Sequence, residues 1–226
     1  MKTFMKSLKE YIHEGLLDEG LLDRVKNKEV NHDALIKEFL KDNYKINGSY
    51  TIKGTKDGFV VDVKGYIKVI NKDITSLTNG LFEFGEVSGE FLCSYCKNLT
   101  SLEGAPEKVG GTFECYNCKA LTTLEGAPEK VGDDFSCRRC ESLKSLEGAP
   151  KEVGDFSCVH CQSLTTLKGA PQKVGGEFDC SECESLKTLE GSPREVGGGF
   201  WCRDCGIQFT EEDVKKHTTA AKKIYI

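Results

Sequence analysis

The stretch FECYNCKALTTLEGAPEKVGDD, residues 113–134, is one unit of a repeat that runs through the middle of the chain. Each unit contains one Cys-x-x-Cys pair, and six such pairs hold all 12 cysteines. They are Cys93/Cys96, Cys115/Cys118, Cys137/Cys140, Cys158/Cys161, Cys180/Cys183 and Cys202/Cys205. Successive pairs begin 22, 22, 21, 22 and 22 residues apart. A constant short period is typical of a solenoid, in which similar coils stack and bury a shared core.

The same spacing also fits four-thiolate zinc sites, in which two Cys-x-x-Cys pairs are separated by about 15–20 residues. Two features favour a stacked core instead. Every gap between pairs is 17 or 18 residues, whereas zinc sites would need only alternate gaps to be constant. The gaps also hold a recurring apolar framework, which a metal-held knuckle does not require. We therefore expect buried thiols and no cofactor, with zinc bound by the twelve cysteines as the alternative, and we rank a disulfide or redox role lower.

The framework predicts the shape of each coil. Phe recurs at 91, 113, 135, 156, 178 and 200, and Leu, Val and Pro recur at fixed places after it. In the segment Phe-x-Cys the Phe and the first Cys point to one face of a short strand. The segment Leu-x-x-Leu-x-Gly-x-Pro is too interrupted for a long helix and predicts an irregular or 3₁₀ return path. Parallel strands of neighbouring coils would lie about 4.8 Å apart.

At this point the chain resembles the leucine-rich repeat family. The family pattern L-x-x-L-x-L-x-x-N/C-x-L corresponds here to G-x-x-F-x-C-x-x-C-x-x-L, with Phe113 and Cys115 at strand Leu positions, Cys118 at the Asn/Cys position and Leu121 following. The match covers residues 90–208 and departs from the family at the first strand Leu, which is Gly. It is most similar to a 22-residue, cysteine-containing variant of bacteria and phages. The resemblance implies an α/β leucine-rich-repeat solenoid with short parallel strands.

Comparison of the repeats with one another separates framework from surface. The residue between Phe and Cys and the two residues inside each Cys pair change freely. These side chains are expected to line one strand face, the concave side of the solenoid, and variable residues on a rigid sheet favour recognition of a protein partner. The predicted partner-binding residues are Tyr95, Glu114, Tyr116, Asn117, Arg138, Arg139, His160, Asp179, Glu182, Trp201 and Arg203. Drift on a solvated face is the competing interpretation.

Charge and composition exclude several classes of function. The formal charge of −5 argues against nucleic-acid binding, which favours a basic surface. The sequence contains no apolar stretch of about 20 residues, so we expect no membrane span. The N-terminus also lacks the apolar core of a secretory signal. The expected location is therefore the cytoplasm of a bacterial host cell, with a phage virion as the alternative. No catalytic constellation is present, so we expect no enzyme.

Both ends of the chain differ from the repeats and are expected to cap them. The predicted divisions are an α+β cap over residues 1–88, a six-coil solenoid over 89–208 and a C-terminal cap over 209–226. Asn31 is a predicted N-cap, followed by a helix and by strands at 49–53, 59–63 and 66–70. Thr210 and Asp213 predict a capping box for a helix ending near Lys223, before an edge strand at 224–226.

The N-terminal segment also resembles the capsid-targeting peptides of internal head proteins of T4-like phages. The resemblance implies cleavage by a prohead protease after Ile12-His13-Glu14. A helix that docks on its own domain is the competing interpretation. The sequence as a whole predicts a phage-encoded, non-enzymatic protein-binding module, with a zinc-binding repeat protein and a head-packaged phage protein as alternatives.

Overall fold

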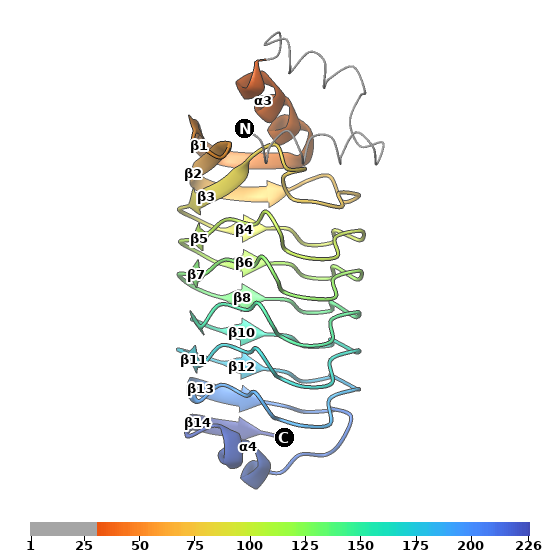
Figure 1. The fold of residues 1–226 in the computed structure, drawn as a ribbon. Coiled ribbons are helices and arrows are strands. Elements are labelled where there is room, and N and C mark those ends of the chain that lie inside the picture. The colour runs from red at the N-terminus through yellow and green to blue at the C-terminus, as the bar shows by residue number, and fades with distance from the viewer. Residues whose placement is uncertain (1–30) are drawn as a thin grey trace.

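The computed structural model describes residues 31–226, and in them the chain forms a parallel β-solenoid (Figure 1). This confirms the predicted repeat solenoid with short parallel strands and a helix near each end of the described chain. The elements are α3 His32–Asn43, β1 Tyr44–Gly54, β2 Phe59–Val69, β3 Glu83–Val87, β4 Phe91–Leu92, β5 Lys108–Val109, β6 Phe113–Glu114, β7 Lys130–Val131, β8 Phe135–Ser136, β9 Glu152–Val153, β10 Phe156–Ser157, β11 Lys173–Val174, β12 Phe178–Asp179, β13 Glu195–Trp201, α4 Glu211–His217 and β14 Ala220–Tyr225.

Each coil contributes two short strands, and these form two ladders. The first, here called the Phe ladder, pairs β4, β6, β8, β10, β12 and the end of β13 in parallel. The second, the Val ladder, contains β3, β5 and β7, and then β9, β11 and the start of β13. β13 spans both ladders without a break, so in the other coils the Val-ladder strand and the Phe-ladder strand are two pieces of one interrupted strand. Stacking of the recurring Val residues was expected from the sequence, but their pairing as a second set of strands was not predicted.

The Phe ladder places a continuous row of rings inside the solenoid. The six Phe side chains are fully buried, and neighbouring ring centroids lie 5.1–5.5 Å apart. Two rows of Leu, from Leu99 and Leu102 onward, pack beside them on the return path. The return path consists of turns, with no 3₁₀ helix assigned within residues 31–226.

The coil that contains Cys137 and Cys140 has 21 residues instead of 22, and it interrupts the Val ladder. β7 and β9 are neighbours along the solenoid, yet they are the two ends of the strand order and are not paired with each other. In the regular coils the N–H of Gly132 donates to the carbonyl of Val109, and that of Gly175 to Val153, both at 2.9 Å. In the short coil the N–H of Gly154 donates instead to Asp133, at 2.6 Å. The missing residue therefore removes one strand pairing from the Val ladder, whereas the Phe ladder stays continuous.

The two ends of the solenoid are closed by different elements. At the upper end in Figure 1, β1 pairs antiparallel with β2, and Asn31 caps α3 as predicted by accepting from the N–H of Ala34. The strands predicted at 59–63 and 66–70 are one strand, β2. At the other end the capping box of Thr210 and Asp213 is confirmed. The helix α4 stops at His217, before the predicted end, because the chain continues as β14 on β13.

Several expectations concern the overall form of the chain. The column runs straight from β4 to β14 in Figure 1, and this view shows no concave side. Among residues 31–226 no helix is long and apolar enough to cross a membrane. The predicted cleavage after Ile12-His13-Glu14 lies outside the described residues.

Candidate functional site

The candidate site is the outer side of the Phe ladder, here called the strand face. It consists of the residue after each Phe and the two residues inside each Cys pair. Strand pairing brings Glu114, Ser136 and their equivalents into one row. Backbone hydrogen bonds such as Asn117 N–H to Arg138 and Glu182 N–H to Arg203, both at 2.8 Å, align the inner residues of successive coils. The structure thereby brings the eleven predicted residues onto successive coils of one face.

The second inner residue of every Cys pair has a left-handed backbone. These residues are Tyr95, Asn117, Arg139, His160, Glu182 and Asp204, with φ between 52° and 65°. Glycine adopts this region without penalty, and Asn and Asp tolerate it, whereas other side chains cost about 1–3 kcal/mol there. None of the six is glycine. The chain therefore carries a side chain at each of these turns, exposed in four of them and half-buried at Asn117 and His160, at a local cost in stability.

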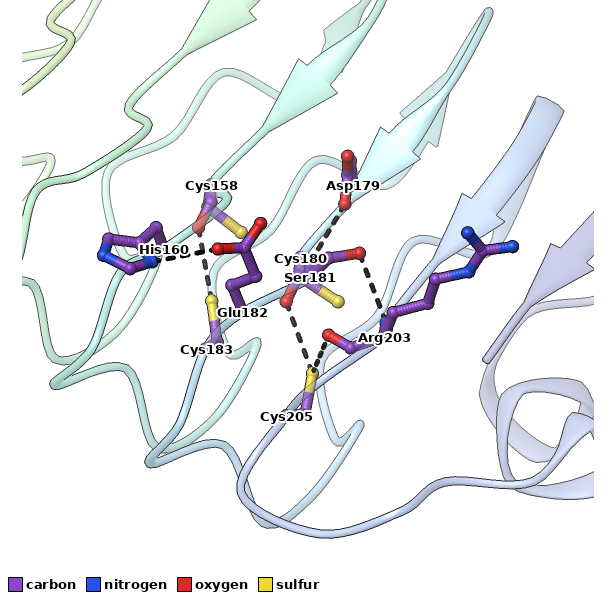
Figure 2. Close-up of polar contacts among 9 residues, drawn as sticks. All are labelled: Cys158, His160, Asp179, Cys180, Ser181, Glu182, Cys183, Arg203 and Cys205. Carbon is purple, nitrogen blue, oxygen red and sulfur yellow. Dashed lines mark hydrogen bonds and ion pairs between the residues drawn. The ribbon is translucent and has the colours of Figure 1, made fainter.

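Polar contacts connect neighbouring coils in the lower half of the face (Figure 2). Nδ1 of His160 lies 3.2 Å from a carboxylate oxygen of Glu182 in the next coil. The carboxylate of Asp179 accepts from the N–H of Ser181 at 2.9 Å, and the hydroxyl of Ser181 accepts from the N–H of Arg203 at 3.2 Å. These contacts fix the side chains of Asp179 and Ser181 against the turns that carry them.

Aromatic groups lie at both ends of the strand face. Tyr95 and Tyr116 meet edge to face with centroids 5.2 Å apart. In the last coil, Trp201 stacks on Tyr225 with centroids 3.5 Å apart, and the guanidinium of Arg203 lies 5.0 Å from the Trp201 ring. The sequence predicted an edge strand that contains Tyr225, but it did not reveal that this strand pairs with β13 and places Tyr225 beside Trp201 on the strand face.

The cysteines lie inside the coils. Eleven are buried, and Cys205 is half-buried. From the second coil on, the second thiol of each pair donates to the carbonyl of the first Cys in the preceding coil, as in Cys118 to Cys93 at 3.2 Å and Cys140 to Cys115 at 3.1 Å. The same contact recurs at Cys161, Cys183 and Cys205. These thiols therefore satisfy carbonyl groups at the ends of the strands, a role the sequence did not reveal.

Burial also changes the acidity of the thiols. It raises the pKa of Cys93 and Cys180 well above the usual value and that of Cys202 to about 12. Metal ligation requires the thiolate, so a buried metal would have to displace these protons. Among residues 31–226 no three His, Cys, Asp or Glu side chains gather as a metal-binding group. The zinc alternative stays a prediction.

The last coil contains the one thiol in the solenoid that is open to reagents. A hollow of about 360 Å³ is lined by Cys202, Cys205 and Phe209, among others. A hydrogen bond with the Cys180 thiol holds the pKa of Cys205 below its usual value, and the thiolate is the reactive form. We expect a thiol-specific disulfide reagent to titrate one cysteine quickly in the native protein and twelve in denaturant. The variant Cys205→Ser should lose the fast phase, and two or more fast equivalents would contradict the structure.

A second hollow lies at the interruption of the Val ladder. It has a volume of about 810 Å³ and is lined by residues 127–132 and 148–152, with Val109. Apolar groups of Pro128, Val131 and Pro150 line it beside exposed Lys and Glu side chains. It contains none of the predicted site residues.

Comparison of the chain with protein-family models, with curated proteins and with solved structures gave no match. The fold alone therefore defines the class, a parallel β-solenoid repeat protein capped at the C-terminal end by a helix and a final strand. The relation to leucine-rich repeats and to phage proteins stays a prediction.

Proposed function

We propose that this chain is a non-enzymatic binding module that presents the strand face to a protein partner. The observation that carries the proposal is the set of left-handed turns that carry exposed or half-buried side chains in place of glycine. A scaffold that needed only stability would favour glycine at these six positions, since glycine avoids the strain. Retaining Tyr95, Arg139 and His160 there is explained if the side chains serve recognition.

The composition of the face supports a protein partner. Tyr, Trp and Arg are the residue types most enriched at the energetic centres of protein interfaces, and Tyr95, Tyr116, Trp201 and Arg203 all lie on it. Ring contacts hold these side chains in place within the face, so less conformational freedom is lost on binding. The phage origin, which the sequence resemblance supports, and the cytoplasmic location are parts of the same proposal.

Substitutions on the face should remove binding without unfolding the protein. We expect Tyr95→Ala and Tyr116→Ala each to weaken capture of the partner at least tenfold, about the effect of an interface hot spot. Immobilised protein is incubated with host lysate, captured proteins are identified by mass spectrometry, and the affinity of the purified partner is then measured. The melting temperature of each variant shows whether the fold is retained.

A matched control comes from the return path. Lys144 is exposed and lies between two buried Leu residues, away from the Cys pair. Lys144→Ala should leave capture unchanged. Equal loss with Lys144→Ala, or full capture with both Tyr variants, would contradict a binding site on the strand face.

A further inference from the structure

The third coil carries two guanidinium groups whose charge has no partner within the described chain. Arg138 and Arg139 are both exposed. Among residues 31–226, no carboxylate forms an ion pair with either side chain, and Arg203 is the arginine found over an aromatic ring.

The acidic groups of the strand face are mostly engaged elsewhere. Glu114 accepts from the hydroxyl of Ser94, Asp179 from the N–H of Ser181, and Glu182 contacts His160. Asp204 lies in the last coil, three coils away from the arginine pair. The positive charge at Arg138 and Arg139 is therefore available to an external ligand.

The arrangement of charge along the stack favours a short acidic segment over a polyanion. Glu114 lies in the coil before the arginine pair, and Asp179 and Glu182 lie two coils after it. Coils follow one another at about 4.8 Å, so a continuous phosphate backbone along the face would meet these carboxylates. A compact pair of carboxylates would contact only the positive coil. Guanidinium groups bind carboxylates through two parallel hydrogen bonds, which adds geometric selectivity.

The coil before the arginine pair indicates which kind of residue the ligand carries beside its acidic groups. The N–H of Asn117 donates to the carbonyl of Arg138, which places the turn holding Tyr116 directly beside the arginine pair. Tyr116 in turn contacts Tyr95. A ligand seated on Arg138 and Arg139 would therefore reach an aromatic surface within one or two coils.

We propose that the strand face recognises an acidic peptide segment of its partner, with two Asp or Glu side chains on Arg138 and Arg139 and an adjoining apolar or aromatic residue on the Tyr95–Tyr116 pair. This rests on the proposed function and names the partner's chemistry. It also assigns recognition of the ligand's charge to Arg138 and Arg139 rather than to the Trp201 end of the face.

The test uses a fluorescently labelled ten-residue peptide that carries two Glu residues beside one Tyr. Its binding to the full chain is followed by fluorescence anisotropy at low salt, together with the same peptide carrying Gln in place of Glu. We expect the Glu peptide to bind at least tenfold more tightly than the Gln peptide, and this preference to shrink as salt is raised. The variant R138A/R139A should lose the preference, whereas Lys187→Ala, an exposed cation on the return path, should keep it.

Equal binding of the Glu and Gln peptides, or an unchanged preference in R138A/R139A with an unchanged melting temperature, would overturn the inference. Tighter binding of a single-stranded oligonucleotide than of the Glu peptide would also overturn it. The proposed function is tested separately, through partner capture by the variants Tyr95→Ala, Tyr116→Ala and Lys144→Ala. A partner lost by the Tyr variants but kept by R138A/R139A would sustain the binding module and refute acidic recognition.

Discussion

Replacing Phe135 with Ala should lower the free energy of unfolding by about 3–5 kcal/mol, the range for truncating a buried Phe. Phe135 is fully buried, and its ring stacks between Phe113 at 5.1 Å and Phe156 at 5.5 Å. Its loss would remove two ring contacts and leave a cavity that neighbouring coils cannot fill, since each coil is held in register by the strands beside it.

Urea denaturation followed by circular dichroism measures this effect. The outward residue of the same strand provides the control, because Ser136 makes no buried contact in the Phe row and Ser136→Ala should change stability by less than about 0.5 kcal/mol. A loss below about 1 kcal/mol for Phe135→Ala would show that the rings are not a close-packed row.

Gly132→Ala should be strongly destabilising, by about 3 kcal/mol, at the upper end of the usual range for overpacking. A Cβ atom at Gly132 would lie 2.1 Å from the carbonyl oxygen of Gly110, which belongs to the backbone of the preceding coil and cannot turn aside. The coils would have to separate along the Val ladder, which breaks the pairing of β5 with β7.

The equivalent position one coil after the interruption provides the matched control. At Gly175 a Cβ atom would lie 3.6 Å from the carbonyl oxygen of Val153, an ordinary contact. Gly175→Ala should therefore be neutral or slightly stabilising, because Ala also restricts the unfolded chain. Thermal melts of the two variants make the comparison, and similar losses at both sites would contradict the spacing of coils at the 21-residue unit.

The residues that recur by type made the interior of the fold predictable. Phe, Cys and Leu repeat at constant spacing, and buried ladders follow from stacking them. Val also recurs at constant spacing, but its pairing as a strand was not visible, because two-residue strands such as β5 have no periodicity of their own. The helix α4 was predicted too long because the run Ala220–Lys223 has good helix propensity, and pairing with β13 overrides it.

The candidate site was predictable to a similar degree. Comparison of repeats selected side chains that the structure does place on one face, because positions free to vary are positions outside the core. It could not reveal the left-handed turns, since no glycine marks them. The 21-residue spacing was evident from the cysteines, but a surface turn can absorb a missing residue without breaking a strand pair, so its effect on β7 and β9 needed coordinates.

The left-handed turns also determine how readily the face can change its specificity. All six share nearly the same φ, so exchanging one ordinary side chain for another leaves the strain almost unchanged. The core rows beneath are made by other residues, and such exchanges would be close to neutral for folding. Each coil thus offers one variable position, and a library varied at Tyr95, Arg139, His160 and Glu182 would keep one scaffold while altering what it recognises.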